Sequence, residues 1–337
     1  MQPTIGLTLG LGDDVRRSRV IEFAQRAEEL GYDSLWVGEA WGRDLFTVLT
    51  HIACHTSRIK LATGIVNVYS RTPTLVAQSI ASLDDISEGR AILGLGTSGA
   101  KVVEDWHGVP YEQPIQRTRE YIEIVNLVVS GERVVYDGRF FKLRDFRLRF
   151  SPPRDRIPIY LASMGPKNVQ LTGELADGWA PVFFAPGYLD RFRADLELGA
   201  RRAGRSAGDV TIAPWMIACV SDDAAHARSL IRGHIAYYVG GMGRYYSELM
   251  ARYGFQEEAE RIKELWVTRR DRDAARDVVT DAMIDAVAIM GNAARCRERI
   301  VELAAQGIES PVLMMPHGAS GQMVRETIDG LAPSAFA

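Results

Sequence analysis

Short apolar runs of strand length alternate along the chain with stretches whose apolar residues recur at helical spacing. Val15–Leu30 is typical of the helical stretches, and it ends before Gly31. Each run and the stretch after it occupy about 25–35 residues, as in βαβ units of a parallel sheet. The runs with strand character are Thr4–Leu9, Ser34–Val37, a run from Ile59, Ala91–Leu95, Ile157–Ala162, Gly178–Phe183, Val210–Val220 and Pro311–Met315.

These runs number eight, which is the number of strands that closes a (β/α)8 barrel. The sequence therefore predicts an α/β fold of the TIM-barrel type, with the active site at the C-terminal rim of the strands. An open doubly wound sheet is the alternative, but it would leave two edge strands to cover.

Three insertions interrupt the alternation. Residues 97–114 form a long loop after the fourth strand, and loops beyond about 12–15 residues tend to be functional. Residues 133–150 predict an added hairpin with Asp137-Gly138 in its turn. A charged helical insertion is predicted near 230–282, because this stretch is too long for a single crossover. We treat residues 1–337 as a single barrel domain that contains these insertions.

Composition and charge narrow the class of protein. The 337 residues are 47% hydrophobic, which is ample for a large core. A formal net charge of −3 argues against a nucleic-acid partner, which calls for a basic face. The three cysteines are far apart without metal-ligand spacing, so we expect reduced thiols and no metal site. No apolar run approaches the roughly 20 residues of a membrane span, and the N-terminus begins a strand rather than a signal peptide. We therefore expect a cytoplasmic protein.

The stretch from Ile59 to Pro73 carries the first chemical signal. Its apolar strand is interrupted by Gly64, and a glycine inside a strand marks a bulge or the close approach of a ligand. Polar residues, Asn67 among them, then arrive together before Pro73 opens a helix. Strand ends of this kind hold ligands in α/β folds. The alternative is an ordinary loop after a bulged strand.

Two glycine-containing segments follow later strands. Gly94-Leu-Gly-Thr-Ser-Gly99 matches the spacing of a dinucleotide fingerprint, but a loop follows it instead of a helix. We interpret it as a rim loop whose backbone lies close to a flat ligand. Ser163-Met-Gly-Pro-Lys-Asn168 opens a helix, and amides at a helix N-terminus beside a lysine suit a phosphate. A plain turn with a solvated lysine explains Ser163–Asn168 equally well.

Glu39-Ala-Trp41 follows the second strand. A carboxylate at a barrel rim is a candidate proton donor, and the indole is a candidate wall of the pocket. A solvated loop acid and a core aromatic are the alternatives. His107 and His317 also lie in expected rim loops, where a lone histidine is more often a surface residue than a catalyst.

Several of these segments together resemble the bacterial luciferase-like superfamily. The resemblance rests on Thr63–Pro73, Gly94–Thr97, Tyr136–Phe140, Ser163–Asn168 and Leu175-Ala-Asp-Gly-Trp179. Within the superfamily, the chain is most similar to the branch that uses the deazaflavin coenzyme F420, typified by methylenetetrahydromethanopterin reductase. The similarity covers nearly the whole chain and is weakest over residues 230–290.

The resemblance implies a TIM barrel, a non-proline cis peptide at Gly64–Ile65 that backs the coenzyme ring, and a phosphate site at Gly165–Lys167. It implies Glu39 as the catalytic residue for proton transfer or ring orientation. The implied coenzyme contacts are Trp41, Thr63, Gly64, Ile65, Asn67, Gly96, Thr97, Met164, Gly165, Pro166 and Lys167. The glutamate tail of F420 would run past basic groups on the rim, for which Arg43, Arg71 and Lys101 are candidates.

We therefore predict an F420-dependent oxidoreductase that moves a hydride between C5 of the coenzyme and a small unsaturated or carbonyl-type substrate. The protein is expected to form a homo-oligomer, such as a homodimer, and to bind neither nucleic acid nor membrane. An FMN-dependent monooxygenase of the same superfamily is the first alternative, and it would need a separate flavin reductase as partner. A non-catalytic flavin-binding relative is the second.

Overall fold

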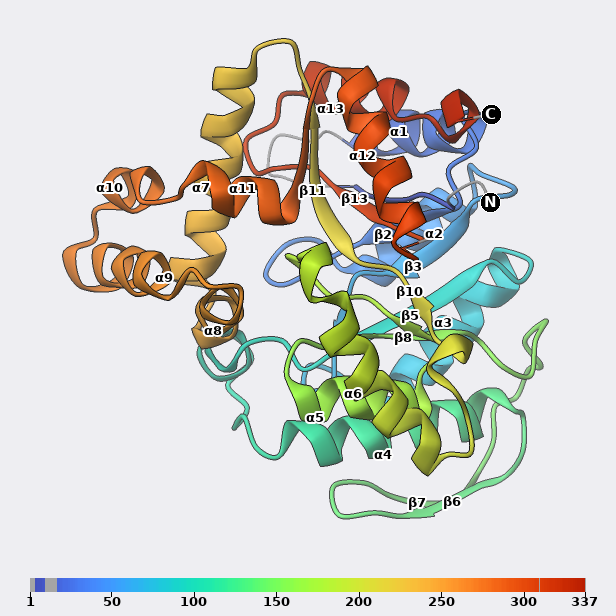
Figure 1. The fold of residues 1–337 in the computed structure, drawn as a ribbon. Coiled ribbons are helices and arrows are strands. Elements are labelled where there is room, and N and C mark those ends of the chain that lie inside the picture. Colours follow the sequence, from blue (N-terminus) through green and yellow to red (C-terminus); the bar gives the residue numbers. More distant parts are fainter. Residues whose placement is uncertain (1–3, 10–16, 309, 337) are drawn as a thin grey trace.

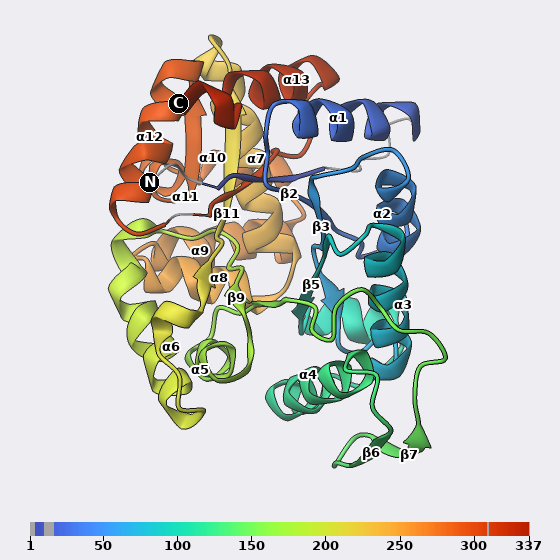
Figure 2. The ribbon, with the colours of Figure 1, turned by 90° about the vertical axis from the view of Figure 1, so that its right-hand side faces the viewer.

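The computed structural model describes residues 4–9, 17–308 and 310–336. Its main feature is an 11-stranded, curled sheet whose strand pairs are all parallel, with helices on its outer side (Figures 1 and 2). The strands are β1 (Gly6–Thr8), β2 (Ser34–Val37), β3 (Lys60–Thr63), β4 (Val66–Asn67), β5 (Ala91–Gly96), β8 (Ile159–Ala162), β9 (Gly178–Trp179), β10 (Thr211–Ile212), β11 (Trp215–Val220), β12 (Ala288–Gly291) and β13 (Val312–Met314). The α/β class predicted from the sequence is confirmed.

The order of the strands brings the chain back toward its own beginning. The pairing path is β10-β9-β8-β5-β3-β2-β1-β13-β11-β12, with β4 paired to β5. At one end of this path, β10 continues through Ala213 and Pro214 into β11, which pairs with β13 and β12 near the other end. The carboxyl ends of the parallel strands therefore meet on one rim of the curl, where they can build a common site.

Apolar side chains fill the interior of the curl and the layer between sheet and helices. All six residues of β5 are buried, as expected for a parallel strand covered on both faces. The helices of the outer layer are α1 (Arg17–Glu29), α2 (Leu45–Ala53), α3 (Pro73–Ile86), α4 (Pro114–Val129), α5 (Pro166–Leu175), α6 (Leu189–Arg202), α12 (Ala293–Ala305) and α13 (Gly321–Gly330). The packing of α5 on α6 requires Gly173 and Gly199, because a Cβ at either would overlap the backbone of the other helix.

The residues predicted as a hairpin form β6 (Val134–Asp137) and β7 (Lys142–Phe146), which pair antiparallel. The turn is longer than the sequence predicted, because Asp137 already pairs with Lys142. Glu120 of α4 fixes this turn by accepting the backbone N–H groups of Arg139 and Phe140, each at 2.9 Å. Glu120 therefore supports the hairpin turn.

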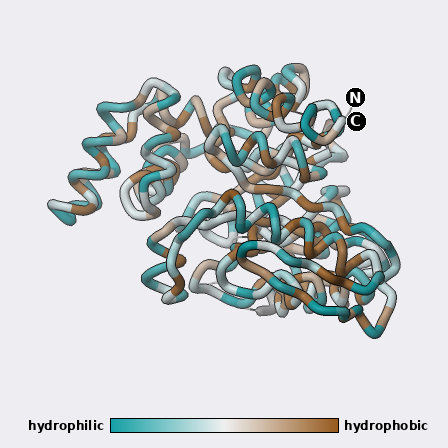
Figure 3. Tube along the Cα trace, turned by 90° about the horizontal axis from the view of Figure 1, so that it is seen from below, coloured by the Kyte–Doolittle hydropathy of each residue, from teal (hydrophilic) through white to brown (hydrophobic). Residues whose placement is uncertain are grey.

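The helices between β11 and β12 stand to one side of the sheet (Figure 1). They are α7 (Ala224–Gly241), α8 (Arg244–Arg252), α9 (Gln256–Lys263), α10 (Arg272–Asp277) and α11 (Asp281–Val287). The projecting helices at the left of Figure 3 carry alternating hydrophilic and hydrophobic residues along the chain. Strand β12 was missed in the sequence, because its four residues directly follow α11 without a turn signal. Among the described helices, none is long and apolar enough to cross a membrane.

Candidate functional site

A cavity of about 630 Å³ opens at the carboxyl ends of β5 and β8, between the first turn of α5 and the helices α7 and α8. Most of the predicted coenzyme contacts line it, namely Gly64, Ile65, Gly96, Thr97, Met164, Gly165, Pro166 and Lys167. Trp41, Thr63, Asn67 and Glu39 are not among the lining residues. The cavity therefore joins three segments that are far apart in the sequence.

The base of the cavity is the strand end at Gly64–Ile65. The Gly64–Ile65 peptide bond is cis, so this expectation from the family resemblance is confirmed. A Cβ at Gly64 would lie 2.5 Å from Cη2 of Trp215, and a Cβ at Gly96 would lie 3.0 Å from Cδ1 of Ile65. Side chains at these two positions would displace the residues that shape the base, which explains the glycines predicted to lie near a ligand.

Thr63 stands behind this base and supports it. Its hydroxyl donates to the carbonyl of Gly94 and accepts from the N–H of the same residue, both at 2.8 Å. The side chain is fully buried. Thr63 thus ties β3 to β5 beneath the cavity, and its predicted coenzyme contact stays a prediction.

The N-terminus of α5 forms one end of the cavity. Gly165 is the N-cap residue, it makes no side-chain cap, and Pro166 occupies the first turn. Lys167 is exposed beside this terminus, and Nη1 of Arg252 donates to the carbonyl of Met164 at 3.0 Å. An uncapped helix N-terminus flanked by two cations attracts an anion through both its amides and its dipole. We refer to Gly165–Lys167 and Arg252 as the anion end.

Two residues that line the cavity carry buried polar atoms with no hydrogen-bond partner among the described residues: Oδ1 of Asn168 and Nε1 of Trp215. Buried polar side chains in native proteins are nearly always hydrogen-bonded, so each exception calls for an explanation. Trp36 stands 5.7 Å from Trp215, ring centroid to centroid, and its Nε1–H donates to Ser34 at 3.0 Å. The indole beside the cavity differs from its neighbour in lacking an internal acceptor.

Tyr111, Tyr238, Tyr245 and Tyr246, which we call the aromatic wall, line the side of the cavity facing α7 and α8. Burial raises the pKa of Tyr238 to about 12 and raises the pKa of Tyr111 and Tyr246 further. These phenols are therefore neutral at physiological pH. Sequence analysis missed the aromatic wall, although the adjacent pairs Tyr237-Tyr238 and Tyr245-Tyr246 in the helical insertion were a visible signal.

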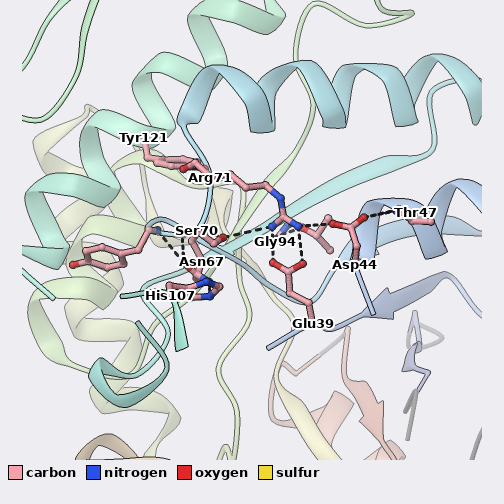
Figure 4. A network of polar contacts seen from close by, with 11 residues as sticks. Glu39, Asp44, Thr47, Asn67, Ser70, Arg71, Gly94, His107 and Tyr121 are labelled. Carbon is pink, nitrogen blue, oxygen red and sulfur yellow. Dashed lines mark hydrogen bonds and ion pairs between the residues drawn. The ribbon is translucent and has the colours of Figure 1, made fainter. Parts of the chain in front are cut away.

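Glu39 belongs to an ion-pair network on the same rim (Figure 4). Its two carboxylate oxygens accept from Nη1 and Nη2 of Arg71 at 2.6 and 2.9 Å, and Nη2 also contacts Asp44 at 2.5 Å. The hydrogen bonds to Glu39 raise the pKa of the Arg71 guanidinium above its ordinary value. Only 11% of the Glu39 side chain is exposed. With both oxygens in use, the proton-transfer role of Glu39 stays a prediction.

The remaining predicted residues lie near the cavity without lining it. Oδ1 of Asn67 accepts from the N–H groups of Tyr69 and Ser70 at 3.0 and 2.8 Å, so this side chain shapes the loop after β4. Nδ2 of Asn67 lies 3.2 Å from Nε2 of His107. Trp41 is 54% exposed. The structure therefore places Asn67 in the support of the rim and Trp41 at its surface.

Two of the cations predicted for the coenzyme tail pair with acids of the protein. Arg71 holds Glu39 and Asp44, as described above. Lys101 contacts Asp105 at 2.6 Å, and both side chains are exposed. An exposed pair of this kind contributes little stability and exchanges readily for another anion. Lys101 is thus still suited to a tail, whereas Arg71 is committed to the ion-pair network.

Comparison with known proteins identifies the family. The sequence model of the family described as luciferase-like monooxygenase matches residues 5–310. The chain belongs to this family. Membership confirms the resemblance drawn from the motifs of strands β3 and β5 and of helix α5.

Luciferase-like relatives match nearly the whole chain. A Mycobacterium tuberculosis protein provisionally named a coenzyme F420-dependent oxidoreductase is 33% identical over 96% of this chain and 97% of its own. The 5,10-methylenetetrahydromethanopterin reductase of Methanolobus tindarius is 33% identical over 94% of this chain and 95% of its own. The structure of the coenzyme F420-dependent tetrahydromethanopterin reductase of Methanopyrus kandleri is 28% identical, covers 100% of both chains and has a TM-score of 0.87.

Proposed function

We propose that this protein is an oxidoreductase that uses coenzyme F420 to transfer a hydride to or from a small unsaturated or carbonyl-type substrate. The observation that carries the proposal is the full-length similarity, in sequence and in fold, to reductases named for this coenzyme. We take the curled sheet to be the (β/α)8 barrel of the family, because β10 and β11 form one continuous segment at its seam. The single domain, the homo-oligomer and the cytoplasmic location stay predictions.

The residues of the cavity fit the coenzyme. Gly64 and Gly96 present no side chain at the base of the cavity, and Ile65 between them is apolar, which suits a planar ring. The anion end suits the phosphate, and its two cations would neutralise part of the phosphate charge. The unpartnered atoms of Asn168 and Trp215 are one donor and one acceptor, and a deazaflavin ring system carries both kinds of complementary group.

When bound, the deazaflavin supplies a ring carbon, C5, that accepts or donates the hydride. The protein's part is to bind and orient. Gly64–Ile65 would support one face of the ring, Thr97 would border its edge, and Lys167 would hold the phosphate. The aromatic wall would keep water from the space beside the ring, because its half-buried rings make that side of the cavity largely apolar.

Titration of the purified protein with F420 and with FMN tests the proposal. We expect F420 to bind at least ten times more tightly, a difference of about 1.4 kcal/mol. Lys167→Ala should weaken F420 binding about threefold at low salt and less at high salt, because an exposed charge contact is screened. Lys142→Ala, which removes a lysine of the hairpin, is the matched control and should leave binding unchanged.

Equal or tighter binding of FMN would move the assignment to an FMN-dependent monooxygenase with a separate flavin reductase. A Lys167→Ala variant that binds F420 as tightly as the parent at every salt concentration would remove the anion end from the proposal. Binding of F420 without any hydride transfer across a broad set of carbonyl and unsaturated compounds would favour a non-catalytic relative.

A further inference from the structure

The two sides of the cavity differ in charge. The charged side chains among the described lining residues are Lys167, Glu248 and Arg252. Arg252 contacts the carbonyl of Met164 at the anion end, and Glu248 lies one turn earlier on α8, where its half-exposed carboxylate pairs with Arg244 at 3.6 Å. The other side, from Tyr111 to Tyr238 and Tyr246, carries aromatic and aliphatic groups.

The aromatic wall is packed as a rigid unit. Phe183 lies behind it and meets the rings of Tyr238 and Tyr246 edge to face, at centroid distances of 5.1 and 5.7 Å. Tyr238 and Tyr246 also meet each other edge to face at 4.9 Å. Aromatic rings prefer such edge-to-face contacts, which hold them in fixed orientations. The surface facing the cavity is therefore preformed.

Two hydroxyl groups of the aromatic wall, those of Tyr111 and Tyr245, form hydrogen bonds within the protein. The Tyr245 hydroxyl donates to the Tyr111 hydroxyl at 3.0 Å, and the Tyr111 hydroxyl donates to the carbonyl of Ser98 at 3.5 Å. Tyr111 also stacks on Tyr69, with centroids 5.2 Å apart. The pair joins the long loop after β5 to the helical insertion and adds no charge to the cavity lining.

We propose that the substrate is an uncharged, mainly apolar carbonyl or unsaturated compound that binds against the aromatic wall; this rests on the proposed function and narrows its substrate class. A carboxylate placed there would lose its hydration without gaining a counter-charge, because the cations of the cavity lie at the anion end and the charged lining residue next to Tyr245 on α8 is Glu248. A flat apolar group would instead keep the ring contacts that the aromatic wall offers. The coenzyme phosphate would occupy the anion end, so its cations would not serve the substrate.

Two ketones that share the same aryl ketone skeleton test this proposal. Acetophenone is neutral, and 4-acetylbenzoate adds one carboxylate to the same aryl ketone. Calorimetric titration of the F420-saturated protein should show acetophenone binding at least ten times more tightly than 4-acetylbenzoate. Equal or tighter binding of 4-acetylbenzoate, or failure of both ketones to bind, would overturn the proposal.

A positive charge introduced beside the aromatic wall should reverse the preference for acetophenone over 4-acetylbenzoate. Met242 lines the cavity beside the aromatic wall, and it lies outside the buried hydrophobic core, so Met242→Arg should fold. We expect this variant to bind 4-acetylbenzoate at least ten times more tightly than the parent does and to lose affinity for acetophenone. Ser247→Arg adds the same charge to α8 outside the cavity lining, and it should change neither affinity.

An unchanged preference in Met242→Arg, with a parental thermal melting curve, would show that the ketones bind elsewhere and would overturn the proposal. Repeating the titrations without coenzyme separates the two levels of inference. Selective binding of acetophenone by a protein that fails to bind F420 would sustain the apolar site and remove the F420 proposal. Tight F420 binding together with tighter binding of 4-acetylbenzoate than of acetophenone would sustain the F420 proposal and remove the apolar site.

Discussion

The ion-pair network of Glu39 and the cavity residues Trp215 and Asn168 differ in how their polar atoms are satisfied. In the network, both oxygens of Glu39 and both terminal nitrogens of Arg71 have partners within the protein. At the cavity, Nε1 of Trp215 and Oδ1 of Asn168 have none among the described residues. A charged residue at a strand end is thus a weak indication of a ligand contact. A buried polar atom without an internal partner, in a residue that lines a cavity, is a stronger one.

The largest effect is expected from Glu39→Ala. The substitution would leave the largely buried Arg71 with Asp44 alone, and removing one member of a buried ion pair costs up to about 3–5 kcal/mol. Because Asp44 remains, we expect a loss of about 2–4 kcal/mol in the free energy of unfolding, measured by urea denaturation.

Glu39→Gln separates this structural role from proton transfer, because it keeps the shape of the side chain and removes its charge. We expect its stability to fall, and its rate of hydride transfer decides between the two roles: a rate within a few-fold of the parent would assign Glu39 to the ion-pair network alone. A variant of parental stability whose turnover is lost, together with a changed pH profile, would instead establish Glu39 as the proton-transfer residue and would break the comparison between the two regions.

A smaller effect is expected at the base of the cavity. A Cβ at Gly64 would push against the six-membered ring of Trp215, so Gly64→Ala should displace one of the two unpartnered groups. We expect F420 affinity to fall at least tenfold, about 1.4 kcal/mol. The free energy of unfolding should fall by about 1 kcal/mol, near the low end for overpacking, because Trp215 borders a cavity and can shift.

Gly233→Ala is the matched control for that experiment. Gly233 lies inside α7, where an added Cβ meets nothing within 4 Å, so alanine should leave F420 affinity unchanged and favour the helix. Parental affinity in Gly64→Ala, measured by fluorescence titration, would show that Trp215 is not positioned for the coenzyme.

Local signals explain what the sequence could predict. The strand break at Gly64 and the helix opening at Gly165-Pro166 each depend on a few adjacent residues with restricted conformations, and both now lie at the cavity. The apolar runs predicted the strands of the curled sheet other than β4 and β12, because strands buried on both faces are continuously apolar. Strand β12 was not predicted, because four residues that directly follow a helix show neither a strand-like alternation nor a turn signal.

Contacts between residues that are far apart in the sequence explain what could not be predicted from it. Arg71 lies 32 residues after Glu39, and nothing local indicates that the parallel strands β2 and β3 bring the two loops together. The aromatic wall likewise joins Tyr111 to Tyr245, which are 134 positions apart. A residue type at a rim can be predicted from the sequence, but whether its charge serves a ligand or a neighbouring loop is decided by tertiary contacts.

The smallest effect is expected from a buried polar atom that lies outside the cavity lining. It shows that an unpartnered buried atom does not always indicate a ligand contact. Nε2 of His234 is buried and has no hydrogen-bond partner among the described residues, yet His234 does not line the cavity. Its Nδ1 accepts the backbone N–H of His317 at 3.0 Å, so the neutral ring carries its proton on Nε2. Burial lowers the pKa of His234 well below 6.5, and it also lowers the pKa of His317. The atom is tolerated because the ring stays neutral.

This arrangement predicts how stability depends on pH. The unfolded chain takes up protons on these histidines near pH 6.5, whereas the folded protein resists protonation until a lower pH. Stability from the neutral rings is therefore complete above about pH 6.5 and is lost as the pH falls toward the lowered pKa values, by up to about 1.4 kcal/mol per pH unit and histidine. His234→Asn keeps an acceptor for the His317 N–H and cannot titrate. Urea denaturation between about pH 7.5 and 5 should show a shallower loss of stability in this variant than in the parent. A full parental slope would assign the acid sensitivity to other groups and would leave the unpartnered Nε2 without an explanation in terms of charge.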